Sequence, residues 1–158
     1  MEPKGSENLK DRHILIAVDE TESSKRAVLY VADILGGFPG FKATLLSIIP
    51  EPEEDFFEKE EERREWVKQR LVEAERLLDN YRQILIQSGF PPEKVHVRTF
   101  VAGDCPLSDV ILDFRCDLSC CTVVVGRHHH SKTEEFLFGS VSSQLIHEAK
   151  NCAIWVVE

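Results

Sequence analysis

The sequence predicts an α/β fold, an open five-stranded parallel sheet with helices on both faces. Three observations lead to this prediction. Short, continuous apolar runs rich in Val and Ile recur along the chain, as in strands that are buried on both faces. Segments with apolar residues at helical spacing separate these runs, and Gly or Pro residues mark most of the junctions. Because parallel neighbours need crossover helices, this alternation indicates a parallel sheet.

The first two strands are predicted from the runs "HILIAVD" (13–19) and "FKATLLSII" (41–49). Pro50 is expected to end the second of them. Between the two strands, the pattern of residues 23–35 predicts a helix. Its buried side is expected to be formed by Ala27, Val28, Val31 and Leu35.

The acidic segment "EPEEDFFEKEEERRE" (51–65) carries many like charges, so its first part is predicted to be a solvated loop. Phe56 and Phe57 are its only candidate anchors. A long helix follows, which Gly89 is expected to stop. One apolar stripe runs along about five turns of this helix, formed by Val67, Leu71, Ala74, Leu78, Tyr81 and Leu85.

The remaining strands are predicted at 94–103, 120–126 and 152–158. Asp104 is a suitable N-cap for the helix after the third strand, with Pro106 in its first turn. The last helix is predicted from about residue 135 to residue 150. Five strands thus alternate with four helices, in one domain spanning 13–158 after a flexible tail of residues 1–12.

Composition limits the classes of partner. The net charge of −9 without a basic cluster argues against nucleic acid. No apolar run approaches the roughly 20 residues that cross a bilayer, and the polar N-terminus lacks a secretory signal, so we expect a cytoplasmic protein. Reduced, buried thiols are expected for the four cysteines in or beside apolar segments, which are Cys116, Cys120, Cys121 and Cys152.

The candidate site lies at the carboxyl ends of the strands, where open parallel sheets bind their ligands. Gly126 ends the fourth strand, and Gly139 with Ser140 follows near the start of the last helix. Backbone N–H groups there favour an anion, so this spacing predicts a phosphate site. The same glycines could instead serve only a strand-ending turn and a close packing contact.

At these residues the chain resembles the universal stress protein family. The family's nucleotide signature is Gly, two residues, Gly, nine residues, Gly, then Ser or Thr, and it aligns here with Gly126, His129, Gly139 and Ser140. His129 stands where the family has its second glycine. The segments "ILIAVDETESSKRAVLYVADIL", "VAGDCPLSDVI" and "GSVSSQLIHEAKNCAIWVV" are also similar to the family, so the resemblance covers nearly all of 13–158.

The resemblance implies a Rossmann-like fold, related to the adenine nucleotide alpha hydrolases, that binds ATP, with or without Mg²⁺, in stress response or signalling. It also implies a homodimer formed through the last strand, Ala153 to Val157. By position, Asp19 would lie beside the adenosine, Ile48 would meet adenine through its backbone, and Val125 would flank the nucleotide. The remaining implied nucleotide contacts are Gly126, His129, Gly139, Ser140 and Val141.

Other kinds of site remain as alternatives. A metal site would use His128–His130 with Cys120 and Cys121, but adjacent side chains of an extended chain point to opposite sides and the usual ligand spacings are missing. An ATP-hydrolysing enzyme would need a base, and no Walker lysine is present, so at most slow hydrolysis is expected. The runner-up is a dimeric interaction module of the same fold that binds no nucleotide, with Trp155 in its partner surface.

Overall fold

The sheet of the computed structural model, which describes residues 11–127 and 141–158, has the strand order β3-β2-β1-β4-β5. Every neighbouring pair is parallel. The strands are β1 (Arg12–Ala17), β2 (Phe41–Pro50), β3 (Val95–Ala102), β4 (Thr122–Gly126) and β5 (Ala153–Val157). The predicted five-stranded parallel sheet is confirmed. Strand order reverses between β1 and β4, which places the switch point of the sheet at their carboxyl ends.

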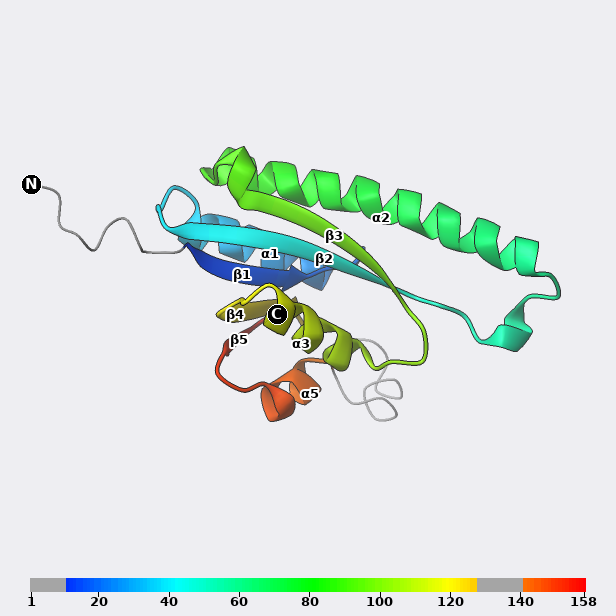
Figure 1. Cartoon of the computed structure of the whole chain (residues 1–158). Coiled ribbons are helices and arrows are strands. Elements are labelled where there is room, and N and C mark those ends of the chain that lie inside the picture. Colours follow the sequence, from blue (N-terminus) through cyan, green and yellow to red (C-terminus); the bar gives the residue numbers. More distant parts are fainter. Residues whose placement is uncertain (1–10, 128–140) are drawn as a thin grey trace, which may run out of the picture.

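Helices cover both faces of this sheet, as predicted. One core lies between the sheet and the helices α1 (Glu22–Leu35) and α2 (Glu60–Ser88). The other core lies beneath α3 (Leu107–Asp117) and α5 (Val141–Glu148). Figure 1 shows α3 and α5 on the side of the sheet opposite α2. Short 3-10 helices, η1 (Glu54–Phe56) and η2 (Pro92–Lys94), precede α2 and β3.

Helix α2 is longer than the sheet that it covers. Its 29 residues span about 43 Å at 1.5 Å per residue. Its buried residues, Ala74, Leu78, Tyr81 and Leu85, all lie in its C-terminal half. The helix ends at Gly89, whose φ of 122° suits a residue without a Cβ. Figure 1 shows its N-terminal half extending beyond the end of β1, toward η1.

Two local predictions were wrong. Helix α3 begins at Leu107 with Pro106 as its N-cap residue and no side-chain capping bond, so Asp104 does not cap it. Among the cysteines only Cys120 is buried, whereas Cys116 and Cys121 are exposed and Cys152 is half-buried. Burial raises the pKa of the Cys120 thiol to about 11. All five cysteines carry free thiols.

None of the helices within the described part of the chain is both long and apolar enough to cross a membrane.

Candidate functional site

The carboxyl ends of β1, β2 and β4 meet at the switch point of the sheet. Asp19 follows β1, Ile48 lies near the end of β2, and Val125 and Gly126 end β4. Val141 is the first residue of α5. Together these five residues line one cleft of about 80 Å³, with Ser24, Leu107 and other neighbours. The structure therefore brings together the predicted site residues that it describes, whereas His129, Gly139 and Ser140 lie outside the described residues.

Asp19 is held in a tight polar turn at the start of α1. Its Oδ1 accepts hydrogen bonds from the backbone N–H of Thr21 at 2.9 Å, from the Thr21 hydroxyl at 2.5 Å and from the Ser24 hydroxyl at 2.9 Å. Thr21 is the N-cap of α1, and its Oγ1 accepts from the backbone N–H of Ser24 at 3.4 Å. These contacts fix the carboxylate against the helix start.

Tyr81 of α2 supports this turn from the other side. Its hydroxyl donates to the backbone carbonyl of Asp19 at 3.0 Å. Burial, followed by the negative charge of Asp19, raises the pKa of Tyr81 to about 12, so the hydroxyl keeps the proton that it donates. Helix α2 and the turn after β1 are therefore connected by a direct contact at the site.

Gly126 has a packing reason to be glycine. A Cβ at this position would lie 2.4 Å from the carbonyl oxygen of Ser23 and 2.8 Å from the backbone nitrogen of Ser24. Both are backbone atoms of the first turn of α1, which cannot move aside cheaply. The close contact between α1 and the end of β4 thus explains Gly126 without a ligand. The structural alternative expected a strand-ending turn at Gly126 and close packing at Gly139, which lies outside the described residues.

A second, larger cavity adjoins the cleft and was not predicted from the sequence. It has a volume of about 760 Å³ and shares Asp19, Ile48 and Leu107 with the cleft. Its outer side is formed by Phe56 of η1 and by α2 residues that include Trp66, Arg70 and Glu73. Phe56 is one of the two predicted anchors of the acidic segment, together with Phe57, but its side chain is 71% exposed.

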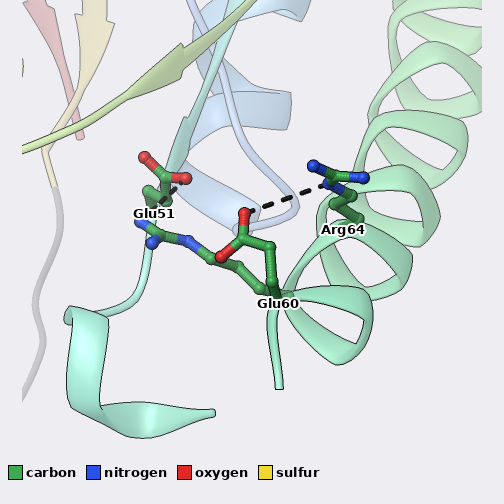
Figure 2. Close-up of polar contacts among 4 residues, drawn as sticks. Glu51, Glu60 and Arg64 are labelled. Atoms are coloured by element: carbon green, nitrogen blue, oxygen red, sulfur yellow. Dashed lines mark ion pairs between the residues drawn. The ribbon is translucent and has the colours of Figure 1, made fainter. Parts of the chain in front are cut away.

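An ion pair ties the start of α2 to the end of β2. The Arg63 guanidinium lies 2.9 Å from Oε1 of Glu51, with both side chains partly buried. Figure 2 shows Glu51 on the chain that leaves β2, directed toward the beginning of α2. Glu60 and Arg64 pair within the helix at 3.9 Å, as one turn of spacing allows, but both are exposed. The ion pair between Arg63 and Glu51 therefore contributes more to the position of α2 than the pair within the helix does.

The larger cavity is acidic. Of the residues that the structure describes, Asp19, Glu20, Glu51 and Glu73 line it together with one cation, Arg70. These carboxylates do not converge, and no group of three or more His, Cys, Asp or Glu side chains within 11–127 and 141–158 could hold a metal ion. His128–His130, the centre of the metal alternative, lie outside the described residues.

Comparisons with known proteins agree with this architecture. The sequence model of the universal stress protein family matches residues 11–158. The structure is similar to that of hypothetical protein MJ0577, with a TM-score of 0.75 and 25% identity over 92% of this chain and 94% of that chain.

Two structurally similar proteins carry nucleotides. The universal stress protein from Archaeoglobus fulgidus, in complex with dAMP, has a TM-score of 0.62 and 21% identity over 93% of this chain and 98% of that chain. A universal stress protein in complex with cAMP has a TM-score of 0.67 and 17% identity over 93% of this chain and 97% of that chain. At these identities the likeness concerns the fold. Comparison with curated proteins gives no significant match.

Proposed function

The chain belongs to the universal stress protein family, and we propose that it binds an adenine nucleotide at the carboxyl ends of β1, β2 and β4. The observation that carries this proposal is the meeting of Asp19, Ile48, Val125, Gly126 and Val141 around one cleft. These are the described positions at which the family resemblance implies nucleotide contacts. Neighbours of the same fold that hold dAMP and cAMP support the adenine nucleotide class.

The described residues suit the nucleoside part of such a ligand. Ile48, Val125 and Val141 offer apolar surface, which suits a base and a ribose. The cleft alone, at about 80 Å³, has room for only a few water molecules, so a nucleotide would also occupy the larger cavity. The phosphate contacts proposed for Gly139 and Ser140 rest on the sequence.

We propose ATP as the physiological nucleotide, accompanied by Mg²⁺ on its phosphates, and a role as a sensor in stress response. Within the described part of the chain, Asp19 is the only residue lining the cleft that has an acidic or basic side chain. Its Oδ1 already accepts three hydrogen bonds that build the turn. A residue so engaged is a poor general base, which favours binding over fast turnover.

The proposal includes a homodimer formed through β5, which ends the sheet. Trp155 packs partly against the core and edge-to-face on Tyr30, with ring centroids 6.3 Å apart. The neighbouring Val156 and Val157 remain half-exposed and line a surface hollow with Tyr30. A second copy would cover this apolar surface.

Calorimetric titration with ATP and Mg²⁺ tests the nucleotide proposal. We expect saturable binding by the wild-type protein. His129→Gly restores the family signature and should bind at least as tightly, whereas His128→Gly changes the adjacent histidine and serves as the matched control. Absence of heat for all three proteins at high micromolar nucleotide would reject the proposal. Binding by His129→Gly alone would identify His129 as the residue that prevents it.

A further inference from the structure

Aromatic side chains from η1 and from the N-terminal half of α2 form part of the wall of the larger cavity. Phe56 and Trp66, which we call the aromatic wall, both line this cavity. Phe57 lies between them, with its ring centroid 4.9 Å from that of Phe56 and 6.1 Å from that of Trp66. The three rings therefore form one continuous cluster at the entrance to the site.

Packing of the core does not account for Phe56, although Phe57 and Trp66 are half-buried. Phe56 is 71% exposed, and no residue of α2 before Ala74 is buried. A phenylalanine that remains in water contributes little to the free energy of unfolding. One exposed aromatic residue would need no explanation, but here it lies beside a second aromatic residue on the wall of a cavity.

The aromatic wall is held in place by neighbouring charges. The Arg70 guanidinium lies 5.2 Å from the centre of the Trp66 ring, within the range of a cation–π contact. The ion pair between Glu51 and Arg63 at 2.9 Å fixes the preceding turn of α2 to the end of β2. These contacts position Trp66 before a ligand arrives, which lowers the entropic cost of binding. Phe56 is placed by its contact with Phe57.

The charge of the larger cavity indicates which part of a ligand enters it. Among the described residues, four carboxylates and the Arg70 guanidinium line the cavity. Arg70 pairs with Glu73 at 3.5 Å and Arg63 pairs with Glu51 at 2.9 Å. Carboxylates still outnumber these cations, so a phosphate group is disfavoured there. An uncharged planar ring meets no such repulsion and gains contact with the aromatic wall. The volume of about 760 Å³ is within the range of roughly 300–1,000 Å³ found for pockets that bury small organic ligands.

We infer that Phe56 and Trp66 bind the base of the nucleotide by stacking, with its phosphates directed away from the larger cavity toward Gly126 and α5. This inference rests on the proposed function and adds contacts made by η1 and by the N-terminal half of α2. Stacking tolerates different bases because every base has a π face. The wall should therefore supply affinity for bases in general, and a ligand without a base should not engage it.

Fluorescence can report on the wall directly, because the chain has two tryptophans. Trp155→Phe leaves Trp66 as the single emitter, whereas Trp66→Phe leaves Trp155, which lies on β5 beside Tyr30. We expect ATP and adenosine to produce a saturable change in the emission of the Trp66-only protein. Tripolyphosphate, which has no base, should produce none, and the Trp155-only protein should not respond to any of the three.

Calorimetry with two wall variants and one control measures the contribution of the contact. Phe56→Ala and Trp66→Ala should each weaken ATP binding about tenfold. Phe38→Ala removes a phenylalanine that is 64% exposed in the turn before the amino end of β2, whereas the cavity lies at the carboxyl end of that strand. This variant should bind as the wild type does. Circular dichroism and urea unfolding check that all three variants remain folded.

The outcomes separate this inference from the proposed function. Binding of ATP by the wild type, with unchanged Trp66 emission and unchanged affinity of both wall variants, would overturn the stacking inference and leave the proposed function standing. Absence of ATP binding by the wild type and by His129→Gly would overturn both. A tenfold loss shared by Phe38→Ala would also reject the inference, because the effect would not be specific to the wall.

Discussion

At Gly126, one missing methyl group decides how closely α1 approaches β4. The sequence pattern singled out this glycine for its spacing to Gly139 and Ser140, and that spacing favoured a phosphate. The structure shows that the backbone of Ser23 and Ser24 occupies the space where a Cβ would lie. A glycine in a binding signature can thus be required by the packing of the fold itself.

Substitution of this glycine should be costly for stability. Gly126→Ala places a Cβ 2.4 Å from a backbone carbonyl oxygen, and we expect it to lower the free energy of unfolding by about 1–3 kcal/mol. Gly103→Ala is the matched control, because no atom lies within 4 Å of its added Cβ. That change should be neutral or stabilise by up to about 1 kcal/mol. Urea unfolding measures both, and equal effects would contradict the packing explanation.

His13 makes stability depend on pH. Its Nδ1 lies 3.1 Å from the Leu118 carbonyl, to which it donates, and its Nε2 lies 2.7 Å from the Thr44 hydroxyl. The neutral imidazole satisfies both contacts, donating from Nδ1 and accepting at Nε2. Burial, aided by Lys42 and His96, lowers the pKa of His13 below its ordinary 6.5, although the bond to Leu118 opposes this.

Acid should therefore weaken the fold through His13. Between the lowered pKa of His13 and the ordinary value of 6.5, the unfolded chain binds more protons than the folded chain. The contribution of neutral His13 to the free energy of unfolding is therefore complete above pH 6.5 and is lost as the pH falls below that value. His13→Gln cannot titrate and should lose less stability than the wild type between about pH 7 and pH 5. Urea unfolding at several pH values gives the slope of the unfolding free energy against pH for each protein. Identical slopes for the wild type and His13→Gln would show that His13 is not the source of the pH dependence.

At the scale of elements, α2 consists of two halves with different tasks. Its C-terminal half packs on the sheet through Leu78, Tyr81 and Leu85, and its N-terminal half carries Trp66 and Arg70 at the larger cavity. The predicted stripe from Val67 to Leu85 is continuous in the sequence, but Val67 and Leu71 are only half-buried. Helical periodicity identified the face of the helix and could not show where the sheet beneath it ends.

Substitutions in the two halves of α2 should differ in their effect on the free energy of unfolding. Leu78 is fully buried, and Leu78→Ala should destabilise by about 2–5 kcal/mol. Val72 in the N-terminal half is 51% exposed, so Val72→Ala should change stability by less than about 0.5 kcal/mol. Thermal unfolding of the two variants tests this, and a large loss for Val72→Ala would mean that the N-terminal half also packs.

For the whole molecule, the sequence predicted the sheet and its layers well because β1, β2 and β4 are buried apolar runs. The edge strands β3 and β5 are mostly exposed or half-exposed, but they are still rich in apolar residues. It could not predict the larger cavity, because that depends on how η1 and α2 fold back over the end of β2. Asp104 illustrates a different limit, since a good capping residue stands before Pro106 and the helix nevertheless starts at Leu107. Gly126 was predicted from its place at a strand end and its spacing to Gly139 and Ser140, whereas the roles of the other described site residues came from family resemblance. Their meeting in one cleft follows from the topology of the sheet.

The proposed dimer can be tested at the outer edge of β5. The Ala153 N–H donates to the Cys121 carbonyl at 2.9 Å, and alternate residues of a strand direct their N–H groups to opposite edges. Val156 therefore directs its N–H away from β4. Val156→Pro should abolish strand pairing between two copies while the monomer stays folded, and Val156→Ala, which keeps the N–H, should remain dimeric.

Sedimentation over a range of concentrations measures the assembly state. A dimer that persists in Val156→Pro would exclude pairing through β5, and a wild-type protein that stays monomeric at every concentration would exclude the dimer altogether.

The separation between the proposed base contacts and the buried core also affects how the chain can evolve. Residues that contact the base in our proposal, Phe56 and Trp66, contribute little to the buried core, so mutations there leave most of the stability margin intact. Ligand preference can then diverge between descendants of this chain while the sheet and its cores are retained. We expect the sequences of such descendants to differ first in residues 51–70 and last in the strands of the sheet.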